Sequence, residues 1–203
     1  MNPVFKQVFD LLPENYRDRA VIAGGAAADF NRANDIDVFV LGLNSTPKVI
    51  QFKNSLKIPN MIQRDLFTRG TGEDATICKI TDSDIGNNIV IGDIPEDIFG
   101  TIYKPVQILA SPYLSVTDLL LNFDLSCHCV AYTPDGERHV LENITTGLDV
   151  PPKSVNPQFP EYTLGRYRRF CLRYGLQPDA TELIKLCTIP EPVHFRRSER
   201  IED

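Results

Sequence analysis

The fold is decided by residues 20–41, which read AVIAGGAAADFNRANDIDVFVL. Residues 19–22, which are apolar after Arg19, predict a short strand that runs into Gly24 and Gly25. The alanines that follow the two glycines favour a helix. A second segment, from Asp35 to Leu41, is rich in apolar and β-branched residues, which is typical of a buried strand. We therefore expect a strand, a Gly-Gly turn, a short helix and a second strand.

Asp35 and Asp37 stand two residues apart at the start of the second strand. Side chains at i and i+2 point to the same face of a strand, so the two carboxylates lie side by side while Ile36 points into the core. Carboxylates this close repel each other unless a positive charge lies between them. Mg²⁺ is bound by a few carboxylates together with substrate phosphates. The pair is a candidate metal site, although a lone Asp-Ile-Asp also occurs as a simple strand entry or capping pair.

A third acid, Asp124, lies near the start of residues 123–132, which we predict to be another strand. If that strand lies beside the strand of Asp35, the three carboxylates form one cluster. Gly24 and Gly25 have no side chains to block their backbone amides, so these amides could bind a phosphate chain. The alternative is that the two glycines form an ordinary turn. The whole arrangement suits in-line attack on a nucleotide phosphate, with metal ions holding the attacking and leaving oxygens.

These motifs resemble a known signature. Ala23-Gly24-Gly25, followed after nine residues by Asp35-Ile36-Asp37, is similar to the pattern of the polymerase-beta-like nucleotidyltransferase superfamily. The stretch from Gly24 to Asp29 also resembles the Gly-Gly-x-x-Arg-Asp opening of the tRNA CCA-adding branch, but Ala28 stands where that branch has arginine. Phe123-Asp124-Leu125 is similar to the strand that carries the third acid.

The resemblance covers residues 18–132 and implies an α/β (α+β) fold, a mixed sheet flanked by helices. It also implies Mg²⁺-dependent transfer of a nucleoside monophosphate from an NTP to an acceptor hydroxyl on an RNA end, a small molecule or a protein. The implied catalytic residues, which would bind two Mg²⁺ ions, are Asp35, Asp37 and Asp124; the implied nucleotide-binding residues are Gly24 and Gly25. Because the superfamily includes inactive members, a binding or regulatory protein is the alternative, and a toxin or virus-encoded modifier is a third possibility.

The chain divides into an α/β domain of residues 1–150 and an extension of residues 151–203, which begins with a proline-rich linker. Helices are expected in the extension at residues 162–174 and 180–186. The first of these carries four positive charges and no acid, and its aromatic residues share one face. It is either a docked helix with a solvated basic face or a surface for the phosphates of a tRNA-like RNA acceptor or of the NTP. Its arginines are Arg166, Arg168, Arg169 and Arg173.

The remaining segments give a coarser picture. Helices are expected at residues 3–12, 46–56 and 115–121, and strands at residues 75–80, 88–91 and 102–109. The first two of these strands are joined through polar residues 82–87 in a hairpin-like connection. Cys127 and Cys129 are expected in the core rather than at a metal. His128 shares the face of Asp124, where it would border the active cleft.

Composition excludes several functional classes. The 203 residues carry a net charge of -6, which argues against a protein that coats DNA through bulk positive charge. No apolar run approaches the roughly 20 residues needed to span a bilayer. The first residues lack the pattern of a secretion signal. We therefore expect a cytoplasmic protein with reduced cysteines and no membrane partner.

Overall fold

Nine strands form two sheets within the described part of this computed structural model, which comprises residues 1–59, 61–63, 67–69, 76–78, 88–95, 104–141, 144, 147–157 and 160–190. The strands are β1 (Ala20–Ala23), β2 (Ile36–Val40), β3 (Ile62–Gln63), β4 (Phe67–Arg69), β5 (Thr76–Cys78), β6 (Ile89–Ile94), β7 (Val106–Ala110), β8 (Val130–Tyr132) and β9 (Arg138–Val140). Seven of them make a mixed sheet in the order β3-β6-β7-β2-β1-β8-β9, in which only β2 and β7 pair parallel. β4 and β5 pair separately and antiparallel.

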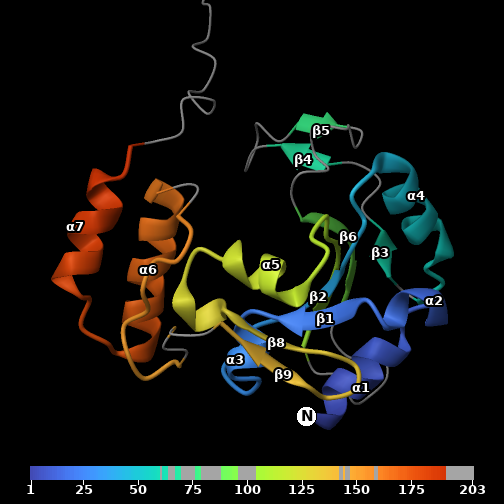
Figure 1. Cartoon of the computed structure of the whole chain (residues 1–203), viewed down its shortest axis with the longest axis horizontal. Coiled ribbons are helices and arrows are strands. Elements are labelled where there is room, and N and C mark those ends of the chain that lie inside the picture. Colours follow the sequence, from blue (N-terminus) through green and yellow to red (C-terminus); the bar gives the residue numbers. More distant parts are fainter. Residues whose placement is uncertain are drawn as a thin grey trace, which may run out of the picture.

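The described residues also form seven α-helices (Figure 1). They are α1 (Pro3–Asp10), α2 (Glu14–Arg17), α3 (Gly25–Ala28), α4 (Thr46–Ser55), α5 (Val116–Leu121), α6 (Pro160–Tyr174) and α7 (Ala180–Thr188). In Figure 1, α6 and α7 lie together at one end of the molecule, and α2 and α4 lie at the other. Among the described helices, none combines the length and the apolar character needed to cross a membrane.

The strands bury both faces, with a period of two. Alternate residues of β1 and β2, such as Ile22 and Val38, pack against Phe5 of α1 and Phe52 of α4. The intervening residues, such as Phe39, pack on the opposite face with the apolar side chains of α5. Asp37 falls on this second face because it is one residue away from Ile36 and Val38. The carboxylate of Asp37 therefore points to the face of the sheet that is opposite to α1 and α4.

The segment that decides the fold forms as predicted. β1 leads through Gly24 into α3, and β2 follows antiparallel to β1, with Ala23 opposite Asp37. α5 is capped by Ser115, whose hydroxyl accepts a hydrogen bond from the Asp118 amide at 3.1 Å. The expected α/β class, with a mixed sheet flanked by helices and a short C-terminal helical extension, is confirmed.

Residues 123–132 are not one strand, and this prediction is wrong. Ser126–His128 form a 3₁₀ turn, and only Val130–Tyr132 form a strand, which pairs with β1 rather than with β2. Residues 124–126 do not continue as this strand because they pair with the proline-rich linker, which lies about thirty residues further along the chain. The Ser126 amide donates to the Lys153 carbonyl, and the Val155 amide donates to the Asp124 carbonyl, both at 2.8 Å.

The predicted pairing of residues 75–80 with residues 88–91 is also wrong. β5 pairs with β4, whereas β6 lies between β3 and β7 in the large sheet. The three isoleucines of β6, Ile89, Ile91 and Ile94, are fully buried there, which accounts for its position inside the large sheet. The expected polar connection at residues 82–87 lies outside the described residues.

The C-terminal helices dock through the predicted aromatic face. Tyr167 and Phe170 of α6 are buried together with Leu186 of α7 against Leu125 and Leu148. The Tyr167 hydroxyl accepts a hydrogen bond from the Asp179 amide at 2.7 Å, at the start of α7. The linker is fixed at Ser154, which pairs with Leu125 in an isolated bridge. As a result, one face of α6 is held across a cavity from the start of β2.

Candidate active site between β2 and α6

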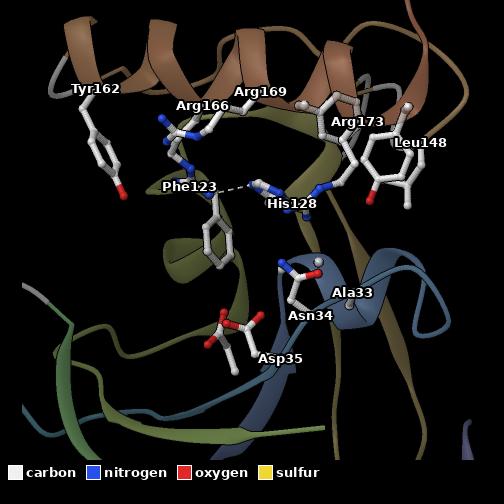
Figure 2. Close-up of a pocket in the computed structure, with 15 residues that line it drawn as sticks. Ala33, Asn34, Asp35, Phe123, His128, Leu148, Tyr162, Arg166, Arg169 and Arg173 are labelled. Atoms are coloured by element: carbon white, nitrogen blue, oxygen red, sulfur yellow. Dashed lines mark hydrogen bonds between the residues drawn. The ribbon is translucent and has the colours of Figure 1, made fainter.

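A cavity of about 310 Å³ lies between the start of β2 and the docked helix α6. Figure 2 shows Asp35 on one side of it and Arg166, Arg169 and Arg173 projecting from α6 on the other. Its walls combine charged, polar and aromatic groups: Gly24, Gly25, Ala33, Asn34, Asp35, Asp37, Phe123, His128, Leu148, Tyr162, Arg166, Arg169, Phe170, Arg173 and Tyr174. Its volume is at the lower end of the range of about 300–1,000 Å³ that is usual for small-molecule sites.

Asp35 and Asp37 form the acidic wall, as the sequence predicts. Ile36 between them is fully buried in the core, so both carboxylates face the cavity. Burial, together with the negative charge of Asp35, raises the pKa of Asp37 to about 7, and Arg166 opposes this rise. Two like charges held this close are stabilised by a divalent cation, so the donor set fits Mg²⁺.

The two glycines lie directly beside this pair. Gly24 has a φ of +83°, and a Cβ at this position would lie 3.7 Å from Oδ2 of Asp37. Gly25 has no positive φ, and its nearest neighbour would be Ala33. Gly24 therefore both permits the turn from β1 into α3 and keeps space open in front of the Asp37 carboxylate.

Three of the four candidate arginines of α6 line the cavity. Arg166, Arg169 and Arg173 are spaced by three and four residues, which places them on one face of the helix. Arg168 is exposed and lies outside the cavity wall. With the Asn34 amide oriented so that its oxygen faces α6, this oxygen accepts hydrogen bonds from both terminal nitrogens of Arg173, at 3.2 and 3.3 Å. This contact ties α6 to the residue just before Asp35.

Asp124 is engaged elsewhere. Its Oδ1 accepts a hydrogen bond from Nη1 of Arg166 at 2.9 Å, and its Oδ2 accepts one from the Thr163 hydroxyl at 3.3 Å. Nη2 of Arg166 lies 3.0 Å from Nδ1 of His128. Asp124 lines a smaller neighbouring cavity of about 160 Å³, which shares Phe123, Tyr162 and Arg166 with the larger one.

The structure therefore brings together Asp35, Asp37, Gly24 and Gly25, but not Asp124. In the part of the chain that the structure describes, no group of three His, Cys, Asp or Glu residues could hold one metal ion. The expected cluster of three carboxylates is corrected to a pair, because β1 separates β8 from β2 and because Asp124 is paired with Arg166. The metal-binding and catalytic roles of the acids stay predictions.

The predictions for residues 127–129 meet mixed outcomes. Cys127 and Cys129 are fully buried, as expected of core residues. His128 lines the cavity, which confirms its place at the border of the cleft. Burial, followed by the positive charge of Arg166, lowers the pKa of His128 to about 3, so its imidazole is neutral.

Several wall residues were not anticipated from the sequence. Asn34 and Tyr162 carried no motif, and Phe123 entered only as a neighbour of Asp124. Asn34 directly precedes Asp35, and this adjacency was the one available signal. Tyr162 reaches the wall through the docking of α6, and Phe123 lies there with its ring against Phe39 of β2. No local sequence pattern predicts either contact.

Comparisons with known proteins add little. No family model matches this chain, and no curated protein matches it. A solved structure described as a tRNA-processing enzyme, apo form I, is 16% identical with a TM-score of 0.46, and the match covers 92% of this chain and 46% of that one. A structure of a tRNA-processing enzyme with CTP is 15% identical with a TM-score of 0.46, covering 83% and 42%. This chain thus spans less than half the length of either.

Proposed function

We propose that the cavity binds a magnesium-chelated nucleoside triphosphate and that the chain transfers its nucleoside monophosphate to a hydroxyl acceptor. One observation carries the proposal: paired carboxylates at the start of β2 face three arginines on α6 across a single cavity. A metal-chelated triphosphate carries a cation and a polyanion side by side. It therefore complements both walls at once, which a simple anion or a simple cation does not.

The acidic wall is suited to the metal. Asp35 and Asp37 provide oxygen ligands, and the raised pKa of Asp37 reflects a repulsion that a bound cation would remove. Mg²⁺ is commonly held by one or two carboxylates plus substrate phosphates. The pair therefore fits one directly bound ion. The second ion implied by the resemblance would lack a third carboxylate beside the pair.

The basic wall is suited to the phosphates. The guanidinium groups of Arg169 and Arg173 match phosphate oxygens through paired N–H donors. Gly24 and Gly25 adjoin the acids on the opposite side, where the absence of side chains lets a phosphate approach the backbone. When bound, Mg²⁺ supplies charge neutralisation at the phosphate oxygens that react.

The proposed reaction is a displacement at the α-phosphorus. The acceptor oxygen forms a bond to that phosphorus, and its proton leaves to solvent. The bond from the phosphorus to the bridging oxygen breaks, and its electron pair departs with pyrophosphate. In this scheme Asp35 and Asp37 hold the metal-bound phosphate in place, and the arginines stabilise the charge that develops on the leaving group.

The acceptor is an RNA end, a small molecule or a protein side chain. A tRNA-like RNA would extend from the cavity along α6, where Arg168 offers a further exposed charge. Because Arg166, Arg169 and Arg173 face the cavity, we assign them first to the NTP. The three acceptor classes are separated by the labelling experiment described below.

A second candidate function is an inactive protein of the same fold that binds Mg²⁺–NTP as a regulator or partner subunit. The observation in its favour is the engagement of Asp124 with Arg166, which leaves the pair of acids without the third carboxylate. This candidate shares the binding step with the first and lacks the transfer step.

The test is incubation of the purified protein with each labelled NTP, Mg²⁺ and a total cell extract, with an Asp35→Ala variant as the control. Transfer of label to RNA, to a small molecule or to protein, lost in the variant, would support the enzyme and identify the acceptor. Binding of Mg²⁺–NTP in calorimetry without any transfer of label would favour the regulator. Absence of both would overturn the proposal.

A further inference from the structure

Asp124 lies in an environment that suits an anchor better than a metal ligand. Both of its carboxylate oxygens accept hydrogen bonds, one from Arg166 and one from Thr163, and both donors come from α6. Its side chain is 12% exposed, and that of Arg166 is 32% exposed. Partly buried, charge-assisted bonds of this kind are stronger than surface ion pairs and fix the geometry of the arginine.

Arg166 in turn determines the state of His128. A guanidinium can only donate hydrogen bonds, so the 3.0 Å contact requires Nδ1 of His128 to accept. The ring proton must then reside on Nε2, and the imidazole must be neutral. Figure 2 shows the ring along the cavity wall between Arg166 and Arg173, with Arg166 on its Nδ1 side.

We infer that Asp124 is a positioning residue: it holds Arg166 on the cavity wall and, through Arg166, holds His128 as an Nε2–H donor. Together they present N–H groups to an anionic phosphate oxygen of the ligand. This inference rests on the proposed function for the identity of the ligand and on the hydrogen bonds above for the positioning itself. The low pKa of His128 is consistent with a ring that stays neutral beside a guanidinium.

A purely electrostatic role for Asp124 predicts the opposite effect on anion binding. Removing a negative charge beside Arg166 would by itself strengthen the binding of an anion. Releasing Arg166 from its anchor would weaken that binding, because the guanidinium would lose its fixed place on the wall. The two effects can be separated by two variants that remove the same charge.

The experiment compares Asp124→Leu with Asp124→Asn. Both variants remove the charge and keep a branched side chain of four heavy atoms, but only asparagine keeps an oxygen that can accept from Arg166. Calorimetry with inorganic pyrophosphate and Mg²⁺ should show about tenfold weaker binding to the leucine variant than to the asparagine variant, as expected for the loss of one charge-assisted hydrogen bond. Equal or tighter binding to the leucine variant would overturn the inference. Thermal unfolding confirms that both variants are folded.

A second readout is independent of any ligand. Nitrogen-15 spectra of the imidazole should show that in the unmodified protein and in Asp124→Asn the His128 proton resides on Nε2. In Asp124→Leu, the two tautomers should mix. A proton on Nδ1 in the unmodified protein, or no change in Asp124→Leu, would overturn the positioning role. If the spectra behave as expected but no variant binds pyrophosphate, the proposed function fails and the positioning of His128 stands.

Discussion

The two walls of the cavity are built in different ways. The acidic wall comes from one strand, where Asp35 and Asp37 share a face because they are two residues apart. The basic wall comes from α6, which reaches the cavity through its docking on Leu125, Cys127 and Leu148. Two of its arginines form hydrogen bonds, Arg166 with Asp124 and Arg173 with Asn34. On the acidic wall the charge of Asp35 helps to raise the pKa of Asp37, and Arg166 opposes that rise only in part. The acidic wall is therefore the one that gains most from a bound cation.

The largest expected effect follows from removing either carboxylate of the acidic wall. Asp35→Ala or Asp37→Ala should lower label transfer more than about a hundredfold, because even outer-shell partners of metal ligands cost 10–100-fold when mutated. Quantified transfer from labelled NTP at saturating Mg²⁺ measures the effect. Asp10→Ala, which removes an exposed carboxylate on α1, is the matched control. Retention of full activity by either variant would exclude the metal role for that acid.

The next effect concerns stability and tests whether the acidic wall is uncompensated. Since the pKa of Asp37 is raised from 3.8 to about 7 in the folded protein, its contribution to the free energy of unfolding is present below pH 4 and is lost as the pH rises through 7. Asp37→Asn should therefore stabilise the metal-free protein at pH 8 by a few kcal/mol, on the order expected for this shift, and by much less at pH 4.

Thermal unfolding at several pH values measures this difference. Added Mg²⁺ should reduce the advantage of the variant at pH 8, because only the unmodified protein keeps both carboxylates for the cation. A variant that is equally stabilised at pH 4 and pH 8 would contradict an electrostatic origin.

Two neighbouring arginines of α6 test whether the basic wall binds phosphate through individual contacts. Arg169 lines the cavity and Arg168 does not, although both are exposed and equally charged. Arg169→Gln should raise the KM for the NTP about tenfold, as expected for one charge-assisted hydrogen bond to phosphate. Arg168→Gln should leave it unchanged. Equal effects of the two substitutions would mean that α6 acts through its overall charge and not through placed contacts.

The same contrast explains which parts of the site could be predicted. Short-range rules were enough for the acidic wall, because strand periodicity placed Asp35 and Asp37 and left Ile36 in the core. They were enough for the cap at Ser115 as well. In each case the decisive interaction joins residues within a few positions of one another.

Asp124 could not be placed by such rules. Its segment pairs with residues 153–155, about thirty positions further along the chain. The strand periodicity assumed for residues 123–132 fails, because Ser126 is buried like Cys127 and its hydroxyl accepts a hydrogen bond from the Lys153 amide. A polar residue in such a position looks exposed until its distant partner is known. The same applies to Arg166, whose partner Asp124 lies in another part of the sequence.

The smallest expected effect is a difference in stability between alanine substitutions at the two glycines that adjoin the acids. Gly24→Ala should lower the free energy of unfolding by roughly 1–3 kcal/mol, because a φ of +83° with a ψ of −143° is a conformation that is essentially restricted to glycine. The added Cβ would lie at ordinary contact distance from Asp37, so backbone strain is the main cost. Gly25→Ala has no such strain and should be neutral or slightly stabilising, since alanine favours a helix. Chemical denaturation of both variants measures the difference. If Gly24→Ala is as stable as Gly25→Ala but loses Mg²⁺–NTP binding, then Gly24 is required for the open approach to the Asp37 carboxylate and not for the turn.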